Sequence, residues 1–269
     1  TGWDDPRIPT LKGARRRGYT PEGFKLFTER IGVAKADSWI DYSILEDCMR
    51  EVLNSSAPRR VAVLDPLKLI INNLPDDFEE DCFAPNHPQN SKLGNRTIKL
   101  TKELWIEKAD FMEEPEKKFF RLFPGNQVRL RYGYVVTCVG CEKDKNGNII
   151  KVLCDYVADT KSGTPGADSI KVKGNIHWLS TKYALNAEVF LYDRLFISEQ
   201  PGSKSNNYLD DINPNSIKVS KIKLEENLID INPGDQYQFE RHGYFICDQK
   251  STETQIKINR SVTLRDTWK

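Results

Sequence analysis

The sequence lacks the short motifs that place a nucleotide or a hydrolytic centre on a fold. It contains no G-x-x-x-x-G-K-[ST] loop, no G-x-G-x-x-G turn, no H-E-x-x-H helix and no G-x-S-x-G elbow. Its three histidines, His87, His177 and His242, lie far apart in the sequence. A lone histidine is more often structural than catalytic, so the residue types alone indicate no assembled active site.

The sequence also lacks an excess of charge of one sign and any long apolar run. Lys and Arg number 40 against 39 for Asp and Glu in 269 residues, so any nucleic acid must be bound by local patches and not by net charge. No run approaches the roughly 18 apolar residues of a membrane helix. The start shows no signal-peptide pattern, and we expect a cytoplasmic protein without membrane contact.

Paired cysteine motifs are scarce. Six cysteines are scattered along the sequence, which predicts reduced thiols in a chain of this size. Cys138 and Cys141 have the C-x-x-C spacing of a zinc knuckle, but a structural zinc needs four ligands and only Cys154 follows nearby. The favoured interpretation is small apolar residues in a hairpin, with no metal site.

The first 57 residues show helical patterns. Thr10 can cap a helix that runs to Arg17 and stops at Gly18. A second start signal is Thr20 followed by Pro21, with Phe24, Phe27 and Ile31 on one face before Gly32. Asp37 or Ser38 is expected to start a third helix that ends before Pro58. Its apolar face is expected to consist of Ile40, Ile44, Leu45, Cys48, Met49, Val52 and Leu53.

From residue 58 onward the pattern is that of short strands separated by turns. The clearest hairpin lies within residues 126–159, with Asn146-Gly147 as its turn. Many short strands with little helix indicate β-barrels. The expected fold class is therefore mainly β with an N-terminal α-helical subdomain.

Two strand patterns carry interaction chemistry. The stretch VRLRYGY is expected to form one strand with Arg129 and Arg131 on the same face. Their side chains would lie about 7 Å apart, a spacing at which two guanidiniums can bind a phosphate or a base edge. In YQFERHGYF, Gln238 can pair with a base edge, and a kink at Gly243 can bring Arg241 beside it. Arg59 is expected at the junction of the helices and the first barrel. Ordinary solvent-facing strands remain the alternative for both patterns. Arginines and Gln flanked by aromatic residues suit single-stranded RNA.

Several stretches of the sequence resemble a known family. The similarity is to class I glutaminyl- and glutamyl-tRNA synthetases, and the stretches that carry it are GWDDPRIPTLKGARRRGYTPE, NSSAPRRVAVLDPLKLII, VRLRYGYVV, LYDRLF, FERHGYF and NRSVTLRDTW. Of these, LYDRLF and NRSVTLRDTW favour the glutaminyl type. The first stretch resembles the segment that follows the ATP-binding signature loop. We therefore expect the tRNA-binding C-terminal portion of such an enzyme. ATP and Mg²⁺ would belong to a catalytic domain outside this sequence, and this portion alone would need no cofactor and be inactive.

The resemblance implies a domain organisation. Residues 1–56 would form the α-helical subdomain, and residues 57–115 with 197–269 the proximal anticodon-binding β-barrel. Residues 116–196 would form the distal anticodon-binding β-barrel. The two β-barrels together would have the arrangement known as ribosomal L25-like. The implied partner is tRNA(Gln), bound at its anticodon loop and inner side by a monomer.

The resemblance also implies site residues. Arg59, Gln238 and Arg241 match the pocket for the middle anticodon base, a uridine. Arg129 and Arg131 match a pair near the first base and its phosphates. The remaining tRNA contacts implied are Arg121 at the third base, Lys35 at the inner side of the tRNA, and Gln89 where the family usually has Asn.

The sequence departs from the family near the third base. Lys118 and Phe120 stand where Gln and Lys are frequent. The alternatives are a glutamyl-tRNA synthetase of archaeal or eukaryal type, a free-standing RNA-binding protein, and a scaffold. A scaffold would show no salt-dependent tRNA binding.

Overall fold

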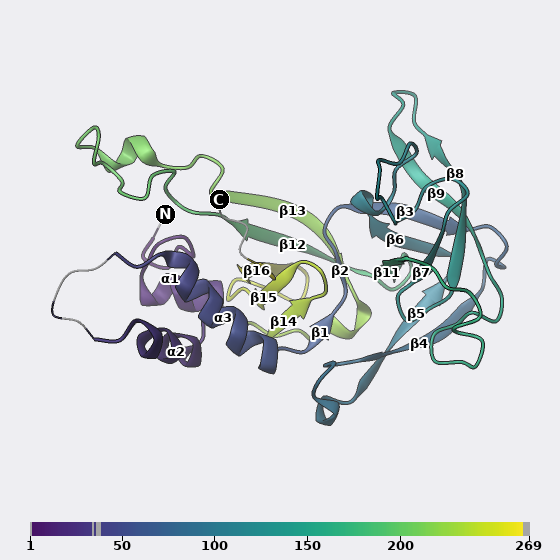
Figure 1. The fold of residues 1–269 in the computed structure, drawn as a ribbon, viewed down its shortest axis with the longest axis horizontal. Helices are drawn as coiled ribbons and strands as arrows, with labels where there is room; N and C mark the ends of the chain where they lie inside the picture. The colour runs from purple at the N-terminus through teal and green to yellow at the C-terminus, as the bar shows by residue number, and fades with distance from the viewer. Residues whose placement is uncertain (1, 34, 36–38, 266–269) are drawn as a thin grey trace. The chain divides into compact units, whose positions relative to one another are not determined.

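The computed structural model describes residues 2–33, 35 and 39–265 (Figure 1). The described part of the chain is mainly β, with its three α-helices near the N-terminus, as the sequence predicts. The helices are α1 (Leu11–Arg17), α2 (Pro21–Ile31) and α3 (Tyr42–Ser56), and the 3-10 turns are η1 (Ser91–Leu93), η2 (Lys108–Asp110), η3 (Tyr208–Asp211) and η4 (Glu226–Leu228). The strands are β1 (Arg59–Arg60), β2 (Ala62–Val63), β3 (Pro66–Ile71), β4 (Glu79–Pro85), β5 (Asn95–Thr101), β6 (Glu103–Glu107), β7 (Gln127–Leu130), β8 (Val135–Lys143), β9 (Ile149–Tyr156), β10 (Gly174–Ile176), β11 (Trp178–Ser180), β12 (Leu185–Tyr192), β13 (Ile217–Leu224), β14 (Gln236–Phe239), β15 (Gly243–Cys247) and β16 (Ile256–Val262).

The caps of α1 and α2 confirm the sequence prediction. The Thr10 hydroxyl accepts the Gly13 N–H at 2.9 Å, and Gly18 ends α1 in the left-handed region with φ 93°. The Thr20 hydroxyl accepts the Gly23 N–H at 3.0 Å, with a proline at the first helical position. A Cβ on Gly23 would lie 2.3 Å from the Met49 sulfur, so this glycine lets α2 approach α3 closely.

The start of α3 differs from the prediction. Asp37 and Ser38 lie outside the described residues, and α3 begins at Tyr42 because Asp41 caps it by accepting the Ser43 N–H at 2.7 Å. Ile40 therefore precedes the helix and Ile44 lies in its first turn, and both are exposed. The rest of the predicted face packs as expected: the buried members are Leu45, Cys48, Met49 and Leu53.

Within the described residues, two seven-stranded sheets curl into nearly closed barrels. Their strand orders are β1-β14-β15-β16-β12-β13-β2 and β10-β7-β8-β9-β3-β6-β11, and β4 pairs with β5 in a separate ribbon. The predicted hairpin is present as β8 and β9, with Gly147 at φ 82° in the turn. Cys138 lies opposite Cys154 there and is buried, in keeping with a small apolar residue, and all six cysteines are free thiols.

The chain divides into two compact units. The first unit comprises the described residues of 1–60, 187–220 and 231–269, and its helices pack on strands β15 and β16 around Tyr19, Met49 and Leu53. The second unit comprises 61–186 and 221–230. Strand β3 groups residues 66–71 with this second unit because it pairs with both β6 and β9. The division into a proximal and a distal β-barrel at residues 57, 116 and 197, which the resemblance implies, stays a prediction.

A buried ion pair fixes the second unit. Arg96 Nε on β5 lies 2.7 Å from Glu225 Oε1, and Glu225 Oε2 accepts the Val61 N–H at 2.7 Å. Both charged side chains are almost fully buried. None of the described helices has the length and apolar character needed to span a membrane.

Candidate nucleic-acid interface

Arg59 and Gln238 are brought together by strand pairing in the first unit. Only Ala57 and Pro58 separate the end of α3 from strand β1, which runs parallel to β14 with Arg59 directly opposite Gln238. The Gln238 N–H donates to the Pro58 carbonyl at 2.9 Å, and the Glu240 N–H donates to the Arg60 carbonyl at 3.0 Å. Two backbone hydrogen bonds therefore fix the register that sets these side chains next to each other.

A chain of polar contacts links the two side chains. Gln238 Nε2 donates to the Tyr244 hydroxyl at 3.4 Å, and that hydroxyl donates to Asn54 Oδ1 at 3.1 Å. Arg59 Nη2 donates to the same Asn54 oxygen at 2.9 Å. Tyr244 is also the antiparallel partner of Gln238 on β15. Gln238 thus stands between Arg59 on one neighbouring strand and Tyr244 on the other.

The guanidinium of Arg59 is buried among neutral oxygens. It donates to the Ala57 carbonyl at 2.6 Å and to the Asn54 carbonyl at 2.9 Å, besides the Asn54 side chain. Burial lowers the pKa of Arg59, and Tyr244 and Glu240 offset this effect only in part. A guanidinium can donate more hydrogen bonds than these three, so donor capacity remains for a further acceptor.

Asn54 and Tyr244 are site residues that the sequence reading did not single out. Asn54 lies in the last turn of α3, and Tyr244 stands in the quoted stretch FERHGYF. Burial raises the pKa of Tyr244, against the opposing charges of Arg59 and Arg50, so the hydroxyl stays protonated and can act as a donor. Their roles depend on the pairing of β1 with β14, which no local pattern reveals.

Arg241 lies in the turn that follows Gln238. Residues 236–247 form a hairpin of β14 and β15, where the sequence pattern indicates a single kinked strand. The reversal is made by Arg241 at φ 71° and Gly243 at φ 134°. Arg241 is exposed, and a left-handed backbone costs a non-glycine residue about 1 kcal/mol or more. Such local strain is frequent at functional sites.

The expected strand with Arg129 and Arg131 on one face ends earlier than the pattern predicts. Strand β7 stops at Leu130, and Tyr132 has φ 65°, so Arg131 belongs to a turn and not to the alternating strand face. Arg129 donates to the carbonyls of Thr160 at 2.6 Å and Ala167 at 2.5 Å. The Arg131 guanidinium lies 5.1 Å from the centre of the Tyr132 ring. Arg129 therefore anchors a loop, whereas Arg131 packs on an aromatic ring.

Arg121 lines a pocket of about 550 Å³ in the second unit. Its guanidinium forms an ion pair at 2.9 Å with the fully buried Asp110. Phe120 beside it is 49% exposed, and the Lys173 ammonium lies 5.1 Å from the centre of its ring. A Cβ on Gly174 would lie 2.1 Å from the Phe120 carbonyl, so only glycine fits there. An exposed ring flanked by cations at a pocket can stack a nucleobase.

The two remaining predicted residues lie on exposed loops. Lys35 is exposed after α2. Gln89 is exposed in the loop between β4 and η1, where its N–H donates to His87 Nδ1 at 3.2 Å. The structure places neither residue in a pocket with the others.

These sites can be compared with known proteins. The family described as tRNA synthetases class I (E and Q), anti-codon binding domain, matches residues 57–157, and a second family of the same description matches residues 175–248. The chain belongs to this synthetase family. Arg59, Arg121, Arg129 and Arg131 fall within the first matched anticodon-binding segment, and Gln238 and Arg241 fall within the second.

Curated relatives match almost the whole of this chain. The glutamine–tRNA ligase of Ralstonia pickettii is 59% identical over 268 residues, which is 99% of this chain and 46% of the relative. Those of Nitrosomonas europaea and Bordetella pertussis are 55% and 54% identical, with 48% and 46% of each relative covered. The chain therefore spans about half the length of these relatives.

Proposed function

We propose that this chain is the tRNA-binding, C-terminal portion of a glutamine–tRNA ligase and that it reads the anticodon of tRNA(Gln). The whole enzyme would join glutamine to tRNA at the expense of ATP, with Mg²⁺ and the catalytic residues in a part outside this sequence. The family match and the glutamine–tRNA ligase names of the relatives support this proposal. The observation that carries it is the juxtaposition of Arg59 and Gln238.

The chemistry of that juxtaposition suits a uracil edge. Uracil offers two carbonyl acceptors and one N–H donor, and a guanidinium with a side-chain amide supplies matching donors and an acceptor. Arg59 and Gln238 are held by Asn54 and Tyr244, so their orientation is set before RNA arrives. Fixed polar groups in a partly buried site discriminate strongly, because a mismatched base leaves one of them unpaired. Arg241, at the exposed turn beside them, would close the pocket over the base.

The other anticodon contacts follow from the remaining geometry. The third base would enter the pocket of Arg121 and stack on Phe120. Arg131 would contact the first base or its phosphates, while Arg129 would hold the loop of residues 160–167 in place for it. Lys35 and Gln89, on exposed loops, would contact the RNA backbone. We retain residues 1–56, 57–115 with 197–269, and 116–196 as the three modules of this binding portion.

The test is a comparison of RNA substrates. The protein should bind tRNA(Gln) more tightly than the same tRNA with cytidine at the centre of the anticodon, and substitution of Arg59 or Gln238 should abolish that preference. Equal binding of the two RNAs by the unaltered protein would refute anticodon reading at this site.

A further inference from the structure

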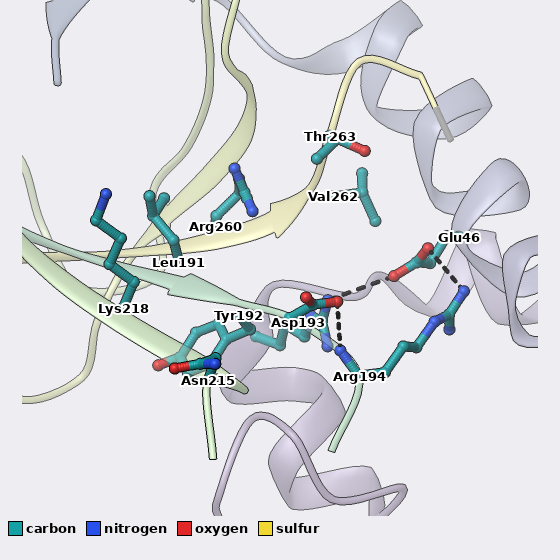
Figure 2. A pocket seen from close by; sticks show the side chains of 11 residues that line it. Glu46, Leu191, Tyr192, Asp193, Arg194, Asn215, Lys218, Arg260, Val262 and Thr263 are labelled. Carbon is teal, nitrogen blue, oxygen red and sulfur yellow. Dashed lines mark hydrogen bonds and ion pairs between the residues drawn. The ribbon is translucent and has the colours of Figure 1, made fainter. Parts of the chain in front are cut away.

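A second charged pocket lies in the first unit, on residues that the proposed base pocket does not use. It encloses about 330 Å³ (Figure 2). Its charged lining residues are Arg17, Glu46, Asp193, Arg194, Lys218 and Arg260. Four cations thus face two carboxylates. The cavity size is at the lower end of the range for small-ligand sites, about 300–1,000 Å³.

Rigid elements of the first unit supply these side chains. Arg17 ends α1, and its Nε donates to the Ser261 carbonyl on β16 at 3.1 Å. Arg260 lies on β16, and Lys218 lies near the start of β13. The Asp193 N–H donates to the Ser216 carbonyl at 2.9 Å, which fixes the end of β12 against the segment before β13. The pocket walls are therefore held by hydrogen-bonded backbone.

The carboxylates do not neutralise the cations. Glu46 alone is shared by Arg17 at 3.4 Å, Arg50 at 3.5 Å and Arg194 at 3.5 Å. Asp193 is exposed and accepts the Arg194 backbone N–H at 2.7 Å. Glu46 is half-buried, and Arg50 has Asp47 as a second partner. Two carboxylates among three guanidiniums still leave a local positive excess, and limited solvent access strengthens its field.

Among the guanidiniums of this pocket, that of Arg260 has the least charge compensation from nearby carboxylates. It is half-buried and makes no hydrogen bond or ion pair with any residue that the structure describes. Burial lowers the pKa of Arg260 and the neighbouring charge of Arg17 lowers it further, and the carboxylates of Asp193 and Glu46 offset these effects only in part. Figure 2 shows Arg260 and Lys218 on the side of the pocket away from Glu46 and Arg194. A desolvated guanidinium without a partner destabilises the protein unless an anion binds to it.

We propose that this pocket binds a phosphate group through Arg260 and Lys218, with the Asn215 amide as a further donor. A guanidinium fork matches two phosphate oxygens, and the dianion offsets the excess of positive charge. The same chemistry is offered by a small phosphate compound and by a backbone phosphate of bound RNA. The site goes beyond the proposed function, because none of its lining residues reads a base.

Two measurements on the full-length protein test the site and identify the source of the phosphate. In the first, inorganic phosphate is titrated by calorimetry at constant ionic strength. Arg260→Met should weaken binding at least tenfold and Arg260→Lys less. Arg15→Met removes an exposed arginine on α1 outside the pocket and should change nothing. In the second, tRNA affinity is measured against salt concentration. If the phosphate belongs to RNA, Arg260→Met should reduce the log–log salt slope by about 1.

Either a phosphate titration that depends on Arg260 or a salt slope reduced only by Arg260→Met supports the site, and the pair of results identifies the source. No effect in both measurements overturns it. Thermal unfolding serves as a control for the possibility that Arg260→Met acts by destabilising the fold. Since the Arg260 side chain forms no hydrogen bond or ion pair within the described residues, Arg260→Met in phosphate-free buffer should leave the unfolding midpoint unchanged or raise it. A fall of several degrees would overturn the proposal, because the guanidinium would then stabilise the fold itself. Loss of anticodon preference would be a separate result that tests the proposed function and not this pocket.

Discussion

Arg59 and Gln238 are direct partners across the parallel strands β1 and β14, although they lie far apart in the sequence. The hydroxyl of Tyr244 and the side chain of Asn54 complete a polar path from one to the other. A base that forms hydrogen bonds with Arg59 and Gln238 would therefore find their donor groups already fixed in position. The account of function depends on this relationship.

The Tyr244 hydroxyl is expected to position Gln238. Tyr244→Phe removes the contacts to Gln238 and Asn54 while it keeps the ring in the core, so tRNA(Gln) affinity should fall by about 0.5–1.5 kcal/mol. The same substitution at Tyr237, a half-buried neighbour on β14 outside this path, is the matched control. Filter-binding titrations would measure both, and an equal loss in the two variants would speak against a positioning role.

Phe120 is expected to stack a nucleobase. Phe120→Ala should weaken tRNA binding by about 1–3 kcal/mol, and Phe120→Tyr should retain most of the affinity. Phe83→Ala removes another exposed phenylalanine of the second unit and should have no effect. A fluorescent 2-aminopurine at each anticodon position in turn would report stacking as quenching that Phe120→Ala abolishes. Quenching that survives in Phe120→Ala would exclude this ring as the platform.

The Arg96–Glu225 pair is expected to be essential to the second unit. Glu225→Gln leaves the Arg96 charge buried beside a neutral amide and should destabilise the unit by about 3–5 kcal/mol. The exposed pair of Lys99 and Asp81, at 2.6 Å, should contribute about 1 kcal/mol or less when Asp81→Asn breaks it. Urea unfolding of the two variants would compare them. Similar losses would mean that burial of the first pair adds nothing.

Asp248 is expected to make stability depend on pH in acid. Burial alone would raise the pKa of Asp248, but hydrogen bonds from Arg16, the Lys250 N–H and Asn259 outweigh it and lower the pKa below its ordinary value of 3.8. A carboxyl whose folded pKa is depressed stabilises the fold above its unfolded pKa, and this contribution is lost as pH falls through the folded pKa. The stability difference between the unaltered protein and Asp248→Asn should therefore be constant near neutrality and shrink below about pH 4. A difference that grows toward acid pH would contradict this sign.

The salt dependence of tRNA binding is expected to be moderate. The net charge is close to zero and the arginines form local patches, so about five neutralised phosphates correspond to a log–log slope of about −4 to −5. Binding measured between low and moderate salt gives the slope directly. A slope near zero would mean that the patches do not face RNA.

Local rules predict α1, α2 and the main hairpin well, whereas the start of α3 differs from the prediction. Thr10, Thr20 and Gly18 act through hydrogen bonds and φ preferences that span only a few residues, and Gly147 sets its turn in the same way. The turn at Arg131 was missed because Tyr132 adopts a positive φ that a tyrosine rarely takes. Alternation of residue types continues through such a turn, so the pattern alone extends the strand too far.

The site was predictable only in part, for a related reason. Arg59 and Gln238 were joined by resemblance to a family, because pairing between distant strands leaves no local signal. Asn54 and Tyr244 went unrecognised since a helix C-terminus and a buried strand residue become polar partners only after β1 pairs with β14. Arg129 was expected to face RNA, but its guanidinium binds two loop carbonyls, a choice that tertiary structure decides.

The most direct test of the account crosses Gln238→Ala with a change of the central anticodon base, measured as tRNA affinity in the full-length protein. The unaltered protein should lose about 1–3 kcal/mol, roughly five- to 150-fold, when the central uridine becomes cytidine, and Gln238→Ala should lose a similar amount on the normal tRNA. Because both changes remove the same contact, the double change should cost little more than either alone. Arg59→Ala and Arg241→Ala should behave in the same way. Fully additive losses would contradict the account, since they would show that Gln238 and the central base act independently.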